Sequence, residues 1–339
     1  MNLLKNNIIF FVVGNSRSGT TMLGRILGRQ KNISTFPELH FFEQLVAFED
    51  IDSDKEWSPD SLLPMTNRLI NNIRNGYFAP KKNYDVISKK LISELGQLNP
   101  MELYLKVLLS EMSGSGKHIP LEQTPRYLFS AGQILEKLPN AKIINMIRDP
   151  RAVMLSQKHK WKRRRLGAKT IPRLEAFRSW ANYHPIFITK LWRANVLEAK
   201  KYEKHPRFFS IKFEDLVNSP EPAIKNICDF LGVIYSDDML EIPKVGSSTK
   251  EDASNQKGID SNIANSWKNG GLTHYELNLC HKVCNKEMRE LGYESSAVAQ
   301  SLFVSLYNIP VIIFKGCISV MLNLGRTKNI FSSIKKRFL

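Results

Sequence analysis

The hydrophobic pattern at the start of the chain predicts a buried strand that leads into a helix. The predicted strand spans residues 7–13, which after Asn7 are all apolar, as in strands of parallel sheets, because both faces of such sheets are covered. A glycine- and hydroxyl-rich loop follows. After it, apolar side chains recur at helical spacing, which predicts a helix with one apolar face: Met22, Leu23, Ile26 and Leu27.

The same alternation recurs along the chain and predicts the fold class. Residues 118–128 predict a short strand, a turn and the start of a helix, and residues 141–157 predict a second strong strand-to-helix unit. Residues 207–216 predict a third strand, and residues 219–233 predict a capped helix that ends at Gly232. Strands that alternate with helices favour an α/β fold with a parallel sheet flanked by helices.

Two segments differ from this pattern. Residues 49–100 are polar and interrupted by prolines, which indicates a mostly helical insertion. Residues 302–325 are long and apolar enough to approach a membrane span, but Asn308, Pro310 and Lys315 interrupt them and further basic residues follow. We therefore expect one domain over residues 1–297 and an apolar, basic tail over 298–339. For the tail we favour an anchor on the membrane surface over packing on the domain, and either over a true span.

Composition narrows the kind of ligand rather than the fold. The net charge is +17, with an isoelectric point near 9.6, so the protein attracts anions such as phosphorylated cofactors, acidic glycans or anionic lipids. No nucleic-acid-binding signature accompanies the charge, and we expect no nucleic-acid partner. Four cysteines make no disulfide framework, which fits a reducing compartment. We expect a cytoplasmic protein, with the tail resting on the inner face of the membrane.

The loop between the first strand and helix is a candidate anion site. Its spacing, Gly14 to Gly19, fits a nucleotide P-loop, but the lysine that should follow Gly19 is Thr20, with Thr21 after it. Helix N-terminal N–H groups favour an anion, and the hydroxyls of the loop add donors. Arg17 supplies a guanidinium that suits phosphate or sulfate oxygens.

A second anion site lies where the strand of the unit 141–157 ends. A kinase or ATPase would place a magnesium-binding carboxylate at this strand end, but the residue here is Arg148. Asp149 and Pro150 fit the start of a helix, and Ser156 lies two turns along it. Two anion sites with little sign of a triphosphate–magnesium site fit a nucleotide with phosphates at its 5′ and 3′ ends.

The stretches "GNSRSGTTML", "IRDPRAVMLS" and "LEQTPRYL" resemble the sulfotransferases that use 3′-phosphoadenosine 5′-phosphosulfate (PAPS). They are most similar to the branch with an Arg-Ser-Gly-Thr-Thr loop, which includes carbohydrate, tyrosylprotein and many bacterial enzymes. The resemblance covers roughly residues 7–295. It implies a P-loop-NTPase-like α/β fold and a PAPS donor, and we expect no metal.

The resemblance also implies roles for individual residues. The 5′-phosphosulfate would be bound by the loop residues Arg17, Ser18, Gly19, Thr20 and Thr21. Arg17 would stabilise the leaving oxygen. Arg148 and Ser156 match the pair that holds the 3′-phosphate. The stretch "NQKGIDSNIANSWKN" resembles a late loop that closes on the nucleotide, which makes Lys257 and Gly258 candidate phosphate contacts.

A general base must take the proton of the acceptor hydroxyl. Glu38 and His40 follow the first helix, where the next strand should return to the same edge of the sheet. In the related branch a glutamate stands at about this distance, so we favour Glu38, with His40 as the alternative. Glu38 is near Phe36, Pro37 and Phe41 in the sequence. These neighbours suggest apolar surroundings that would raise the pKa of Glu38.

Two further segments leave their roles open. In "LEQTPRYL" relatives have a lysine before Thr124, where this chain has Gln123; Glu122 either contacts the acceptor or structures the turn, and Arg126 is a weaker pocket candidate. The basic run 158–165 would bind an acidic acceptor, line the cofactor entrance or form a solvated helix face.

The sequence thus predicts a PAPS-dependent sulfotransferase that sulfates a hydroxyl of a glycan, glycolipid or small alcohol. The first alternative is a non-catalytic nucleotide- or anion-binding protein at a membrane surface, and the second is a P-loop kinase.

Overall fold

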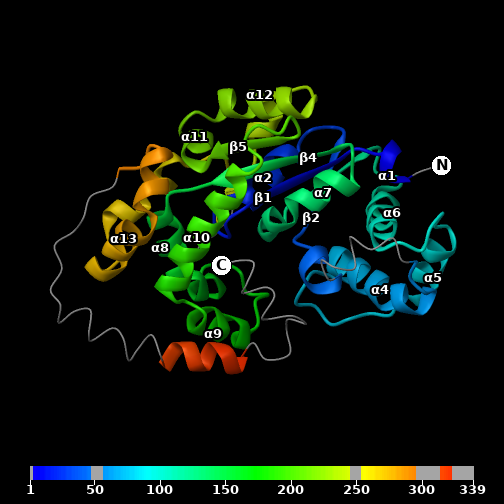
Figure 1. Cartoon of the computed structure of the whole chain (residues 1–339), viewed down its shortest axis with the longest axis horizontal. Helices are drawn as coiled ribbons and strands as arrows, with labels where there is room; N and C mark the ends of the chain where they lie inside the picture. The colour runs from blue at the N-terminus through cyan, green and yellow to red at the C-terminus, as the bar shows by residue number, and fades with distance from the viewer. Residues whose placement is uncertain (1–2, 47–55, 245–252, 295–313, 323–339) are drawn as a thin grey trace.

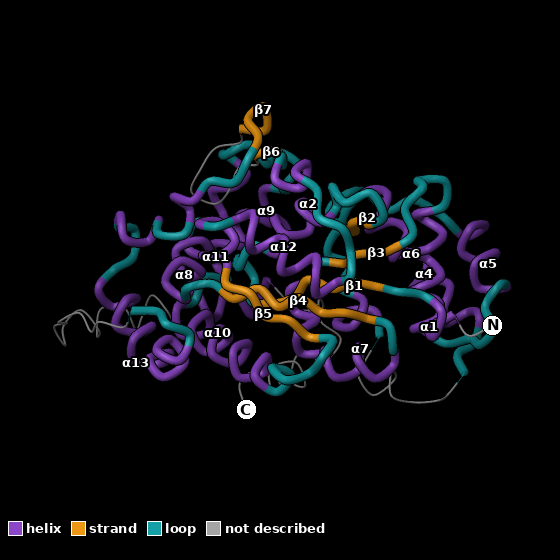
Figure 2. Tube along the Cα trace, turned by 90° about the horizontal axis from the view of Figure 1, so that it is seen from above, coloured by secondary structure: helices purple, strands orange, loops and turns teal. Residues whose placement is uncertain are grey.

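The protein has a five-stranded parallel sheet with helices on both faces. The computed structural model describes residues 3–46, 56–244, 253–294 and 314–322. The strands β1 (Ile9–Gly14), β2 (Ile33–Phe36), β3 (Ile119–Glu122), β4 (Ala141–Ile147) and β5 (Phe208–Lys212) run in the order β2-β3-β1-β4-β5. All neighbouring pairs are parallel, and Figure 2 shows the strands side by side. The predicted fold class is confirmed.

The central strand β1 is buried on both faces, and its alternating side chains enter two separate cores. Ile9, Phe11 and Val13 belong to the larger core. Phe10 and Val12 face the other core, beneath α2 (Thr20–Leu27) and α12 (Pro220–Leu231). This alternation follows from the two-residue period of a strand.

The larger core is completed by helices that follow β2 and β3. They are η1 (Phe41–Leu45), α4 (Pro59–Asn75), α5 (Asp85–Ser93), α6 (Pro100–Met112), η2 (Pro125–Ser130) and α7 (Ala131–Lys137). In Figure 1, α4, α5 and α6 lie together at one end of the molecule. The described part of the predicted insertion consists of α4 and α5; the domain boundary proposed at residue 297 lies outside the described residues.

The opposite end of the molecule carries the helices that follow β4 (Figure 1). They are α8 (Pro150–Lys158), η3 (Lys160–Arg164), α9 (Arg173–Ala181), α10 (Pro185–Lys200) and α13 (His274–Glu290). Cys280 and Cys284 are buried on α13 as packing residues. The remaining elements are α1 (Leu3–Asn6), α11 (Phe213–Asn218), η4 (Asp237–Leu240), β6 (Pro243–Lys244), β7 (Ala253–Lys257), η5 (Ser261–Ile263) and η6 (Ser266–Asn269). Strands β6 and β7 form a small antiparallel sheet apart from the main one (Figure 2).

Part of the apolar tail forms a helix over residues 314–322 that lies beside α9 (Figure 1). The Arg178 Nε donates to the Leu322 carbonyl at 2.9 Å, and the Ser319 hydroxyl lies 2.7 Å from Asn182 Oδ1. The Lys315 ammonium is 4.3 Å from the centre of the Trp180 ring. This part of the tail therefore contacts the domain; the rest of it lies outside the described residues. Among the helices described, none is long and apolar enough to cross a membrane.

Candidate active site

The loop after β1 is a tight turn that only glycine fits at two positions. Gly14 has φ +137°, and a Cβ there would lie 2.3 Å from the Met146 carbonyl oxygen. Gly19 has φ +95°, and its Cβ would lie 2.4 Å from the Phe213 ring. Arg17 also has a positive φ, of 76°. The backbone of the loop is thereby packed directly against β4 and α11.

The N-terminus of α2 points its donors into this loop. Gly19 occupies the N-cap position of the helix, where it supplies no side-chain cap. The first N–H groups of a helix lack partners within the helix and favour an anion. Ser18 and Thr20 are buried beside this helix end, whereas Thr21 is exposed.

The structure brings the two predicted anion loops together. The Arg17 Nε donates to the Ser156 hydroxyl on α8 at 3.0 Å. Arg148, at the end of β4, donates to the Arg17 carbonyl at 3.0 Å and to the Ile263 carbonyl at 3.0 Å. The Arg148 guanidinium also lies 4.2 Å from the centre of the Phe213 ring. Adjacent parallel strands carry these residues, so both arginines meet at one edge of the sheet.

Both arginines are positive charges in a poorly solvated place. Burial lowers the pKa of Arg17 to about 9, helped by repulsion from Arg163 and Arg148 and opposed by Glu38. Burial lowers the pKa of Arg148 to about 10, opposed by Glu214 and Asp149. Both remain cationic at neutral pH. A bound anion would offset the cost of holding two cations close together.

Three buried donors at this site lack acceptors among the described residues. They are the Arg148 Nε, the Ser18 hydroxyl and the Asn15 Nδ2. All three residues line a small cavity between the loop, the end of β4 and α10. Buried donors normally find a partner, so these three fit a site that receives acceptor atoms from a ligand or from water.

The start of α8 is fixed as the sequence predicts. Asp149 caps the helix by accepting from the Arg151 N–H at 2.8 Å, and Pro150 occupies its first position. The Arg151 side chain pairs with the Asp149 carboxylate at 2.7 Å and stacks 3.8 Å from the centre of the Trp267 ring. Trp267 belongs to the predicted late loop, which is therefore tied to the start of α8.

Lys257 and Gly258 lie elsewhere in that late segment. Lys257 is exposed and pairs with Glu241 at 3.2 Å, and Gly258 donates to the Ile242 carbonyl at 2.9 Å. The contact between this segment and Arg148 is made instead by the Ile263 carbonyl, which accepts a hydrogen bond from the Arg148 guanidinium. Their role as phosphate contacts remains a prediction.

Glu38 and His40 stand side by side after β2. The nearest carboxylate oxygen of Glu38 is 3.5 Å from the His40 Nε2, and the side chains are 46% and 18% exposed. Phe36 and Phe41 are buried in the core and do not enclose the Glu38 carboxylate. The apolar surroundings predicted for Glu38 are therefore wrong, because the aromatic side chains turn inward while the glutamate faces outward. Its charge acts on Arg17, which brings it into the same site.

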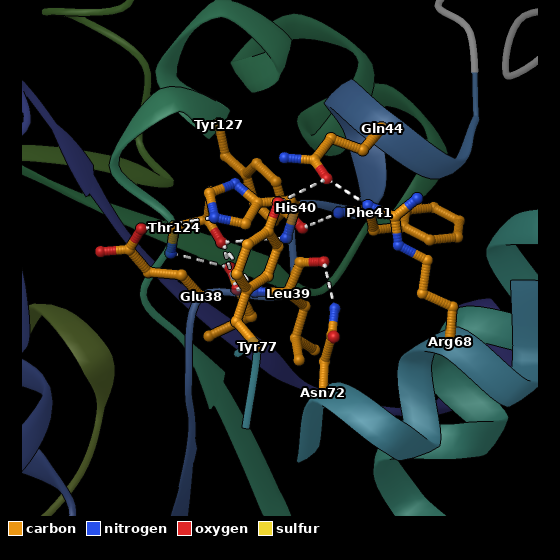
Figure 3. A network of polar contacts seen from close by, with 11 residues as sticks. Glu38, Leu39, His40, Phe41, Gln44, Arg68, Asn72, Tyr77, Thr124 and Tyr127 are labelled. Atoms are coloured by element: carbon orange, nitrogen blue, oxygen red, sulfur yellow. Dashed lines mark hydrogen bonds and ion pairs between the residues drawn. The ribbon is translucent and has the colours of Figure 1, made fainter. Parts of the chain in front are cut away.

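The backbone after Glu38 is held by three side chains of the "LEQTPRYL" segment. Glu122 accepts from the Leu39 N–H at 2.9 Å, and the Thr124 hydroxyl accepts from the same N–H at 3.1 Å. The Tyr127 hydroxyl accepts from the Phe41 N–H at 2.6 Å. Figure 3 shows this network, with Glu38 at one end. Of the two roles left open for Glu122, structuring the turn is the one observed.

Glu122 is completely buried, and three donors reach its carboxylate. Besides Leu39, the Thr124 N–H donates at 3.0 Å and the Thr124 hydroxyl at 2.5 Å. Burial raises the pKa of Glu122 to about 8, although these hydrogen bonds oppose the shift. The neighbouring Gln123 packs against α2, where a Cβ on Gly24 would lie 2.1 Å from its Oε1. The sequence offered no periodic or spacing signal for this network.

Comparison with known proteins agrees with the two anion loops. A model described as the sulfotransferase family matches residues 10–237, about two thirds of the chain. The chain belongs to the sulfotransferase family. The resemblance to the PAPS-dependent sulfotransferases is thereby confirmed, and so is the enzyme class.

Individual relatives are distant. Nodulation protein NoeE of Sinorhizobium fredii is 21% identical over 85% of this chain and 67% of that protein. Mouse carbohydrate sulfotransferase 2 is 24% identical over 45% of this chain, and the match spans only 35% of that protein. Among solved structures, the sulfotransferase domain from the curacin biosynthetic pathway aligns with a TM-score of 0.49 and 20% identity. It covers 86% of this chain and all of that domain.

Proposed function

We propose that the protein transfers the sulfuryl group of PAPS to a hydroxyl of a glycan or glycolipid, with Glu38 as the general base. The observation that carries this is the junction of Arg17, Ser156 and Arg148, where two cationic loops meet at one edge of the sheet. A donor with a 5′-phosphosulfate and a 3′-phosphate has an anionic group for each loop.

The residues present fit such a donor. The N-terminal N–H groups of α2 and the Arg17 guanidinium would hold the 5′-phosphosulfate. Arg148 and Ser156 would hold the 3′-phosphate, and Arg148 keeps a buried Nε donor that lacks an acceptor among the described residues. PAPS supplies the activated sulfuryl group; the chain supplies position and charge.

Each reacting group has a counterpart in this site. Glu38 would take the proton of the acceptor hydroxyl as its oxygen bonds to sulfur. The bond from sulfur to the bridging oxygen breaks, and Arg17 would stabilise the negative charge left on the phosphate. Since the pKa of Arg17 stays near 9, electrostatic stabilisation is favoured over proton donation at neutral pH. His40, beside Glu38, is the alternative base.

The glycan acceptor is supported by a relative named carbohydrate sulfotransferase 2. The test is to incubate the protein with radiolabelled PAPS and fractionated cell extract, and to identify the labelled product. Arg17→Ala and Arg148→Ala should each abolish or severely reduce labelling. Full labelling by both variants would overturn the proposal. Nucleotide binding without any labelled product would favour a non-catalytic binding protein.

A further inference from the structure

The basic run at residues 158–165 divides into cations with partners and cations that face the site. Lys158 pairs with Glu276 at 2.8 Å, and Arg164 donates to the Lys169 carbonyl at 2.9 Å. Lys162 and Arg165 lie 5.8 and 5.7 Å from the centre of the Trp161 ring. Lys160 and Arg163 differ, because among the described residues neither side chain has a hydrogen-bond or ion-pair partner.

The helix η3 places these two residues on one face, near Arg17 and Glu38. Ser156 lies on α8 and contacts Arg17. After α8 ends, η3 (Lys160–Arg164) is a 3-10 helix, so Lys160 and Arg163, three residues apart, share one face. Both are close enough to Glu38 to interact with its charge, and both repel Arg17. Both side chains are half-buried. They therefore extend the cationic surface from the loop of Arg17 toward Glu38.

The charges of this group are unbalanced. Burial lowers the pKa of Lys160 to about 8, helped by repulsion from Arg17, Arg126 and Arg163. Glu38 opposes this shift and also attracts Arg163. One exposed carboxylate thus faces several cations. Arg17 is already assigned to the donor, which leaves Lys160 and Arg163 beside the base. Half-buried cations of this kind are stabilised when an anion binds between them.

The surface beside His40 offers aromatic side chains. Tyr77 packs edge-on against His40, with ring centres 5.5 Å apart, and is 38% exposed. Phe78 packs against Tyr77 and is 48% exposed. An acceptor at Glu38 therefore has exposed aromatic rings beside His40 and a pair of cations close enough to interact with the Glu38 charge. Aromatic faces of this kind give contact area to a sugar ring, and the cations bind a negative substituent.

We propose that the acceptor is an acidic glycan whose carboxylate, sulfate or phosphate group binds Lys160 and Arg163, next to the hydroxyl held at Glu38. This rests on the proposed function, since it names the substrate class of the same site. It is distinct from the donor contacts, which belong to Arg17, Arg148 and Ser156.

The test measures binding of defined hexasaccharides to the full chain saturated with 3′-phosphoadenosine 5′-phosphate (PAP), by calorimetry. The probes are chitohexaose, which is neutral, a hyaluronan hexasaccharide, which carries carboxylates, and a chondroitin sulfate hexasaccharide, which adds sulfate esters. We expect at least one acidic probe to bind about tenfold tighter than chitohexaose, which corresponds to ~1.4 kcal/mol. Tighter binding of both the hyaluronan and the chondroitin sulfate hexasaccharides indicates that the cations bind a carboxylate. Tighter binding of the chondroitin sulfate hexasaccharide alone indicates that they bind a sulfate-type group.

Two double variants separate the proposal from its alternatives. Lys160→Ala with Arg163→Ala should remove most of the preference for the acidic probe while the affinity for PAP stays within about twofold. The double variant Lys162→Ala with Arg165→Ala, from the same basic run, should keep the preference for the acidic probe and the affinity for PAP. Equal binding of neutral and acidic probes, or binding of neither, would overturn the proposal. So would a tenfold loss of PAP affinity in the first variant, because the two cations would then belong to the donor site. Failure of the wild-type chain to bind PAP would instead contradict the proposed function.

Discussion

The Arg17 Nε donates to the Ser156 hydroxyl at 3.0 Å, and this contact joins the loop after β1 to the helix after β4. The two residues are far apart in the sequence, and each comes from a different anion loop. Arg148 completes the junction by donating to the Arg17 carbonyl. The side chains proposed for the two ends of the donor therefore support one another, so changes at one end should be felt at the other.

Ser156→Ala should weaken PAP binding about tenfold. The substitution removes the hydroxyl proposed to bind the 3′-phosphate and the acceptor of the Arg17 Nε, and a hydrogen bond to a charged group contributes ~1.5–3 kcal/mol. Calorimetric titration with PAP measures the effect. Ser93→Ala, at an exposed helix end where the hydroxyl bonds the Lys90 carbonyl, is the matched control and should bind PAP normally. Equal affinities for the two variants would argue against a role of Ser156 in donor binding.

The fold and the donor loops could be predicted from the sequence because each rests on local patterns. The apolar run before Gly14 and the unit ending at Arg148 identify two neighbouring parallel strands. Parallel strands bring their carboxyl ends to one edge, so the proximity of the two loops follows from fold class alone.

The surroundings of Glu38 could not be predicted in the same way. The aromatic residues beside it in sequence suggested an apolar pocket, but in the structure they face the core while the glutamate faces solvent. The network from Glu122, Thr124 and Tyr127 joins segments more than eighty residues apart. Such contacts depend on how β2 and β3 pair, which no local pattern encodes. The same holds for Lys160 and Arg163, which share one face because the chain forms the 3-10 helix η3 after α8 ends.

Gly14→Ala should prevent stable folding of the loop. The new methyl group would lie 2.3 Å from the Met146 carbonyl oxygen, and φ +137° is unfavourable for alanine. Because the clash involves the backbone of β4, the strands must separate, and we expect a loss of several kcal/mol in the free energy of unfolding. Urea denaturation checks this. Gly96→Ala is the control, since its Cβ would meet Glu102 Oε2 at an ordinary 3.8 Å. Similar stability for both variants would contradict the loop geometry.

Glu38→Gln and His40→Asn should separate the two candidate bases. Loss of the base removes general-base catalysis, typically worth 10²–10⁴-fold in kcat, while PAP binding persists because neither side chain belongs to the donor loops. We expect this loss for Glu38→Gln. His40→Asn should reduce kcat by about tenfold or less, through the lost contact with the Glu38 carboxylate at 3.5 Å. Single-turnover transfer from labelled PAPS gives both values. The reverse order of effects would assign the base to His40.

Glu122→Gln should change both the pH dependence of stability and the rate of transfer. Burial raises the pKa of Glu122 to about 8 from an ordinary 4.5, so between these values the folded state binds the proton more tightly than the unfolded state does. Its contribution to the free energy of unfolding is full below pH 4.5 and is lost as pH rises toward 8. Glutamine cannot titrate, so the variant should lack this decline. Urea denaturation at pH 5, 6.5 and 8 measures it, and parallel curves for the two proteins would contradict the shift.

The same residue should position Glu38 through the Leu39 backbone. Glutamine replaces one carboxylate oxygen with a donor, so one of the three donors that reach Glu122 loses its acceptor, at a cost of ~1–3 kcal/mol. We therefore expect kcat to fall about tenfold while the KM for PAPS is unchanged. Thr124→Ser keeps the hydroxyl that accepts from Leu39 and should retain the rate, whereas Thr124→Val should lose it. If both Thr124 variants retain the wild-type kcat, the network supports the fold without positioning the base.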